Sequence, residues 1–205
     1  MITRLLKNRL ALSTVVTTLI ILVISVLLAS VVTYFAINVV STRVQEESLA
    51  LTSTHIWLNS IASPGDPDYS QASVMVINTG GRDVVINKIA IRGQDCAWDS
   101  PTQFVVYTVT NTPITTDMYF QPNPDTASAF QLNPEATGGT AYTFLDASNS
   151  LVLRSGYSML IYVINPDSIT INDIGLTVSV TLYTAQAMYY RESNVQAYVA
   201  PIGSS

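Results

Sequence analysis

The chain has 205 residues, of which 48% are hydrophobic and only 11% are charged, and its formal net charge is −5. An acidic chain repels phosphate, so nucleic acid is not expected among its partners. A single cysteine, Cys96, excludes an intramolecular disulfide, so the fold must depend on packing and backbone hydrogen bonds.

The N-terminal region is a long apolar run behind a basic tip. Residues 10–42 carry no charge, and Arg4, Lys7 and Arg9 precede them. As a helix this run would reach about 50 Å at 1.5 Å per residue, whereas a bilayer core is about 30 Å thick. It is also longer than the usual signal-peptide core of about 7–15 residues. The run therefore predicts a membrane span with a cytoplasmic N-terminus.

The helix is predicted to continue beyond the uncharged run. Apolar residues recur at helical spacing at Ile37, Val40, Val44, Leu51 and Leu58. No glycine or proline occurs before Pro64, and a proline disfavours helix at the residue preceding it. These features predict one unkinked helix over residues 12–62.

The remainder is predicted to be a β domain. Residues 73–78 and 84–91 flank a glycine-rich turn and suggest a hairpin. Phe104–Thr110 suggests another strand, and residues 158–164 suggest a central strand. Residues 176–183 alternate between apolar and polar side chains, which predicts that Leu176, Val178, Val180 and Leu182 face the core. The predicted class is α+β, with a long N-terminal hydrophobic helix followed by an antiparallel, immunoglobulin-like β-sandwich head over residues 63–205.

The order of these parts resembles archaeal type IV pilin-like proteins, in the superfamily of type IV pilins and archaellins. The resemblance covers about residues 4–60: a basic leader, then Ala11, then an apolar helix that opens Leu12-Ser13-Thr14-Val15-Val16. In the head it is weaker and involves the segment VINTGGRDVVINKIAIRG and the alternating last strands. Two positions depart from the pattern. Leu10 precedes Ala11 where a basic residue is usual, and Val16 stands where bacterial pilins carry Glu.

The resemblance implies a processed, polymerising subunit. A prepilin peptidase would remove residues 1–11 by cutting between Ala11 and Leu12, with Lys7 and Arg9 as basic determinants. The helices would then pack in the core of an extracellular adhesive filament. The residues expected in that packing are Leu19, Leu22, Val26, Ala29, Val32, Ala36 and Val40. The expected partners are further copies of the chain, the membrane before assembly, the peptidase, and a secretion ATPase with its platform.

Two other functions stay open: a membrane-anchored surface binding protein that never polymerises, and an archaellum subunit. No catalytic triad, phosphate loop, zinc spacing or carboxylate pair is evident, so neither an enzyme nor a cofactor is expected. His55 is expected to be a packed or interfacial residue, and Cys96 is expected to be a small buried hydrophobic residue. Acidic and amide groups in two loops could bind calcium, but turn formation explains them more simply. They are Asp66, Asp68, Asp167, Asn172 and Asp173. Four C-terminal tyrosines are expected to serve packing or subunit contact rather than sugar binding: Tyr183, Tyr189, Tyr190 and Tyr198.

Overall fold

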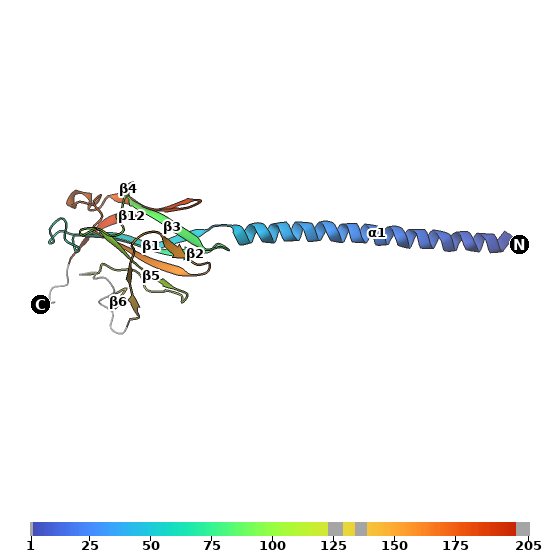
Figure 1. Cartoon of the computed structure of the whole chain (residues 1–205), viewed down its shortest axis with the longest axis horizontal. Coiled ribbons are helices and arrows are strands. Elements are labelled where there is room, and N and C mark those ends of the chain that lie inside the picture. The colour runs from blue at the N-terminus through green and yellow to red at the C-terminus, as the bar shows by residue number, and fades with distance from the viewer. Residues whose placement is uncertain (1, 123–128, 134–138, 200–205) are drawn as a thin grey trace. The chain divides into compact units, whose positions relative to one another are not determined.

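The computed structural model describes the backbone of residues 2–122, 129–133 and 139–199, and the side chains of these except 2–12, 43–45 and 129. The chain forms two compact units, Met1–Gln45 and Glu46–Ser205. The first is one helix, α1 (Ile2–Gln45), and the second is a β domain, here called the head (Figure 1). The predicted α+β class is therefore confirmed.

The helix ends earlier than its apolar spacing predicts. Residues beyond Gln45 leave the helix, and Leu49–Asn59 forms the first strand of the head, β1. A spacing of seven places Leu51 and Leu58 on one helix face, but in a regular strand it would place them on opposite faces. In β1 one extra residue intervenes, since residues 52 and 55 pair with residues 75 and 73 of the next strand. This bulge returns both leucines to the same buried face.

Twelve strands and one short 3-10 helix make up the described head. In chain order they are β1 (Leu49–Asn59), β2 (Ser70–Asn78), β3 (Val84–Ile91), β4 (Gln94–Asp95), β5 (Phe104–Thr110), β6 (Ala129–Gln131), β7 (Ala141–Thr143), β8 (Leu145–Asp146), β9 (Leu151–Leu153), β10 (Ser158–Ile164), η1 (Ile171–Asp173), β11 (Thr177–Thr184) and β12 (Met188–Tyr198).

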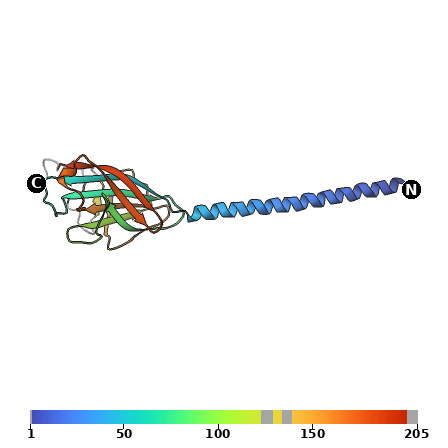
Figure 2. The same cartoon turned by 90° about the horizontal axis from the view of Figure 1, so that it is seen from above.

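Ten strands join in a single curled sheet (Figure 2). The path runs β4-β3-β11-β12-β1-β2-β10-β5-β8, with β9 beside β3, and β6 and β7 pair separately. All neighbours are antiparallel except β1 and β12, the one parallel pair among the described strands. This pair connects two halves whose inner faces share the main core. Two layers therefore face each other as in a sandwich, although the sheet is continuous.

The predicted hairpin between residues 73–78 and 84–91 is wrong. Both segments are strands, but β2 pairs with β1 and β10, whereas β3 pairs with β4, β9 and β11. The glycine-rich turn thus carries the chain from one half of the sheet to the other. The Asn78 side chain stabilises this crossing by donating to the carbonyls of Arg82 and Leu153, at 2.8 and 3.1 Å.

A second core lies on the outer face of the β1-β2-β10-β5 half. Residues from the connection between β5 and β9, including Phe120 and Phe144, cover side chains such as Trp57 and Tyr162. Buried hydrogen bonds hold this covering connection against the sheet. The Gln71 side-chain amide donates to the Gln121 carbonyl at 2.6 Å and accepts from the Gln121 N–H at 3.0 Å. The head is consequently a folded domain with two cores of its own.

Candidate functional site

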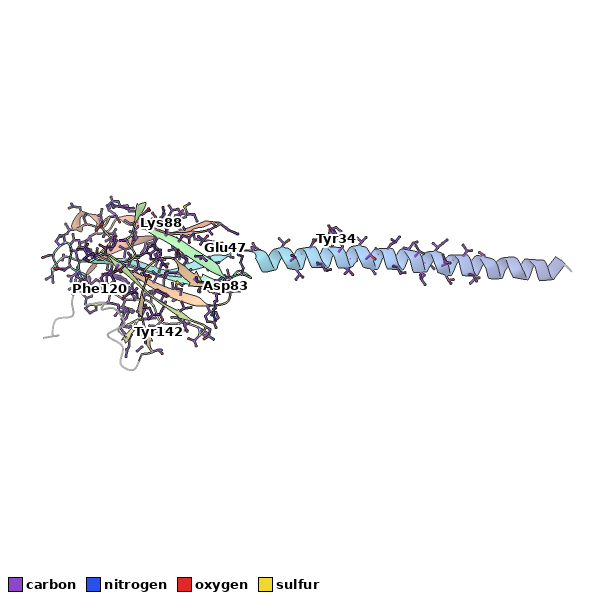
Figure 3. All side chains as sticks on the ribbon, in the orientation of Figure 1. Tyr34, Glu47, Asp83, Lys88, Phe120 and Tyr142 are labelled. Carbon is purple, nitrogen blue, oxygen red and sulfur yellow. The ribbon has the colours of Figure 1, made fainter. Side chains whose placement is uncertain are left out.

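The most unusual surface of the chain is that of α1. The segment Ser13–Thr42 is long and apolar enough to cross a membrane, a property that anchors share with signal sequences. Every side chain in this segment is exposed, and large apolar residues point in all directions around the helix. A helix that is apolar all round is stable only when lipid or protein covers it. Figure 3 shows the Tyr34 side chain projecting from the helix.

The hydroxyl groups of α1 suit a dry environment. Six of them donate to a carbonyl one turn earlier in the helix, at 2.7–2.9 Å. The donors are Thr17, Thr18, Ser25, Ser30, Thr33 and Thr42. An unsatisfied hydroxyl in an apolar medium would cost free energy. Because these groups are satisfied within the helix, they do not oppose its burial.

The predicted packing residues lie together on this helix. Leu19, Leu22, Val26, Ala29, Val32, Ala36 and Val40 are all exposed on α1. They fall within one broad stripe at the helical period. The predicted processing positions, Lys7, Arg9, Ala11 and Leu12, belong to the helical backbone, but their side chains lie outside the described residues.

A second notable site is the entry of the chain into the head, residues 46–48, here called the neck. On one side it contacts the turn between β2 and β3. The Ser48 carbonyl accepts from the N–H groups of Thr79 and Gly80, at 2.9 and 3.1 Å, and the Glu46 carbonyl accepts from Gly81 at 3.2 Å. A Cβ at Gly80 would lie 2.5 Å from the Glu46 oxygen and 2.7 Å from the Ser48 nitrogen. Only glycine allows so close an approach.

The other side of the neck contacts β11 and β12. The Thr184 hydroxyl donates to the Glu47 carboxylate, and the Tyr189 hydroxyl donates to the Glu47 carbonyl at 3.3 Å. Slightly further along, the Arg191 guanidinium donates to the Leu51 carbonyl at 3.0 Å. Glu47 lies with Asp83, which follows the β2–β3 turn, at one end of the head (Figure 3). The neck is therefore held from both sides.

His55 lies in β1 rather than on a helix stripe. Its ring stacks on Trp57, with centroids 5.3 Å apart, and its Nε2 lies 2.9 Å from Asp117 Oδ1. Burial disfavours the charged form of Asp117, but hydrogen bonds from His55 and from the Met118 N–H outweigh this and lower its pKa. The pair joins β1 to the cover of the second core, and the expectation of a packing histidine is met.

The acidic loops form turns. Asp66 accepts from the Ser63 N–H, at 3.1 Å. Both Asp173 oxygens are occupied: Oδ2 accepts from the Thr170 N–H and hydroxyl, each at 2.8 Å, and Oδ1 lies 2.6 Å from Arg92 Nη1. Among the side chains that the structure describes, no three His, Cys, Asp or Glu residues group closely enough to hold a metal. Turn formation is confirmed at these two aspartates.

The Arg92–Asp173 pair is expected to stabilise the head. Burial of Asp173 opposes its ionisation, but hydrogen bonds from Thr170 and Arg92 lower its pKa. Arg92→Ala should therefore reduce the free energy of unfolding by about 1–3 kcal/mol near pH 7. The unfolded carboxylate takes up its proton first as pH falls below about 4, so this contribution should shrink from there downward. Urea unfolding at pH 7 and pH 3 checks both statements, and an equal loss at the two pH values would contradict the assignment.

The four C-terminal tyrosines divide between packing and exposure. Tyr189 packs against the main core, and Tyr198 stacks on Phe120 with ring centroids 3.9 Å apart. Tyr183 lies beneath the Lys88 ammonium, 4.3 Å from the ring centroid. Tyr190 is exposed. Packing is thus confirmed for Tyr189 and Tyr198, whereas no partner is evident for Tyr190 among the described residues.

The head also contains an open groove of about 410 Å³ between β5 and β9. It is lined by Tyr107, Thr108, Val109, Leu145, Val152, Arg154 and Tyr157. Arg154 is the one charged side chain in this lining. Small-molecule sites usually bury most of the surface of their ligand, whereas this groove is open to solvent. The groove is therefore a poor candidate for a selective ligand site.

Sequence patterns did not identify the neck contacts. Gly80, Thr184 and Arg191 all lie far in sequence from residues 46–51, and their contacts with that segment form only in the folded head. The adjacent glycines at 80 and 81 were the single available signal. No protein-family model matches the chain, and a search of curated proteins finds no match. The pilin-like resemblance of the N-terminal region accordingly stays a prediction.

Proposed function

We propose that this protein is a structural subunit of an extracellular type IV pilus-like filament that serves surface attachment. The proposal depends chiefly on one observation, the complete exposure of the apolar side chains of α1 between Ser13 and Thr42. The head has its own cores, so this surface requires lipid or other copies of the chain to cover it. Before assembly α1 would lie in the membrane, and afterwards in a bundle of identical helices.

The energetics favour permanent coverage of α1. Exposing ten Leu, Ile or Val side chains to water would cost roughly 15–30 kcal/mol, at about 1.5–3 kcal/mol each. Transfer from lipid to a helix bundle gains little hydrophobic free energy, because lipid tails are as apolar as leucine. Close packing at small residues such as Ala29 and Ala36 must then favour the bundle. Extraction would need the secretion ATPase and platform that the family resemblance implies.

The length of the apolar segment favours a filament over a simple anchor. The apolar span Ser13–Thr42 has 30 residues, whereas about 20 suffice to cross a bilayer. A non-polymerising binding protein has no need of the surplus. A helix that packs along its neighbours buries every additional turn, so the extra length stabilises a polymer.

Fractionation of cells that produce the protein tests this function. Surface filaments are sheared off and pelleted, and an antibody against the head locates the protein by blotting and electron microscopy. We expect it along filaments in the sheared fraction. Its confinement to membranes, with none in that fraction, would contradict the proposal and favour the anchored binding protein. Rotating filaments on swimming cells would indicate an archaellum subunit instead.

A further inference from the structure

The first and last strands of the head lie side by side and run in the same direction. Residues 56–59 of β1 pair with residues 195–198 of β12, and β1 lies inside the sheet between β12 and β2. The start of β1, next to the neck, and the end of β12 are therefore at opposite ends of this pair. Figures 1 and 2 show the cyan β1 beside the red β12.

The pair is bonded near both of its ends, and the bonds at the two ends differ in kind. Near the end of β12 the bonds form a regular parallel ladder. Near the neck, where the bulge at residues 52–55 interrupts β1, side chains of β12 reach across to β1 or the neck. Arg191 donates to the Leu51 carbonyl at 3.0 Å, and Tyr189 donates to the Glu47 carbonyl at 3.3 Å. Side chains thus replace the backbone ladder where it is missing.

This arrangement determines how the head responds to tension. A pull that enters through α1 reaches β1 at the neck. If the opposing pull acts at the far end, β1 and β12 slide past each other along their axes, and the bonds between them must fail together. A pull between two neighbouring points at one end would instead break the bonds one after another. Bonds that share a load raise the barrier that governs forced unfolding.

We propose that the head has a mechanical function: the parallel β1–β12 pair and the neck contacts form a clamp that carries tension through the subunit. The source of the tension rests on the proposed filament function, because a polymer transmits a pull through α1. The strength of the clamp does not depend on the filament function, because it follows from strand direction and bonding within one chain. A surface-attachment subunit of this design would resist unfolding while its head is held.

Single-molecule pulling on the full chain in detergent micelles tests the clamp. Two introduced cysteines carry the handles. Burial raises the pKa of the Cys96 thiol to about 12, so at neutral pH the native cysteine is protonated and poorly reactive. Thr42→Cys with Val199→Cys loads the pair in shear. Thr42→Cys with Arg82→Cys places both handles at the neck end, where β1 and β2 separate stepwise.

We expect the shear geometry to rupture at a several-fold higher force than the neck-end geometry. Arg191→Ala should lower the shear force, whereas Arg154→Ala, at an exposed arginine outside the pair, should leave it unchanged. Equal forces in the two geometries, or equal effects of the two arginine variants, would overturn the inference. If the shear force is high but the protein is absent from sheared filaments, the filament function is rejected and the mechanical clamp is retained.

Discussion

Leu27→Asp abolishes filaments and weakens membrane insertion. Leu27 lies at the middle of the Ser13–Thr42 segment, with 61% of its surface exposed. A carboxylate at the centre of a membrane helix costs about 3 kcal/mol in insertion experiments. In a helix bundle it would be a buried charge for which α1 supplies no close cationic partner, since residues 10–42 are uncharged. Filament yield and the membrane-bound fraction measure the two effects.

The same chemical change in the head provides the matched control. Leu145 has a similar exposure, 52%, but lies on β8 of the head. Leu145→Asp should leave membrane insertion unchanged and filaments intact. Normal filaments from Leu27→Asp would show that α1 does not form the filament core. Loss of filaments from both variants, with normal insertion, would instead place the assembly surface on the head.

Gly80→Ala should strongly destabilise the head. The new Cβ would lie 2.5 Å from the Glu46 carbonyl oxygen, a backbone atom that cannot rotate away. Relieving the clash separates the turn from the neck and breaks hydrogen bonds that Gly80 and Gly81 donate there. Overpacking and the lost bonds together predict about 3 kcal/mol of destabilisation. Urea unfolding followed by fluorescence of Trp57 and Trp98 measures this loss.

Thr79→Ala separates the clash from the loss of a contact. It removes the hydroxyl that lies 2.9 Å from the Ser48 hydroxyl and 3.2 Å from the Ser48 carbonyl oxygen, but it adds no atom. The expected loss is about 0.5–1.5 kcal/mol, typical of one hydrogen bond. If Gly80→Ala were no more destabilising than Thr79→Ala, the close approach of the turn to the neck would not be needed for stability.

Patterns that depend on one element were predicted well. The uncharged run forms α1 because it contains no glycine or proline that would break a helix and no charged side chain that would need solvation. The apolar segment 158–164 became β10, which is buried between β2 and β5. The alternation before Tyr183 correctly places Val178, Val180 and Leu182 in the core. Leu176 was expected to join them, but it precedes the first residue of β11 and is exposed.

Patterns that depend on strand partners were predicted poorly. The spacing of Leu51 and Leu58 fits a helix and a bulged strand equally, and only the pairing with β2 decides between them. Likewise, two strands around a glycine turn resemble a hairpin. Here β2 is buried along nearly all of its length and already has neighbours on both sides, so β3 must pair elsewhere. Local sequence carries no information on which edges are already occupied.

The N-terminal sequence of the protein in sheared filaments tests the filament account most directly. Edman degradation or mass spectrometry of the pelleted subunit establishes processing and assembly in one sample. We predict that the chain begins at Leu12, after removal of residues 1–11, so that the uncharged helix from Leu12 to Thr42 forms the core. Absence of the protein from that fraction, with an intact Met1 terminus in the membrane, would contradict the account.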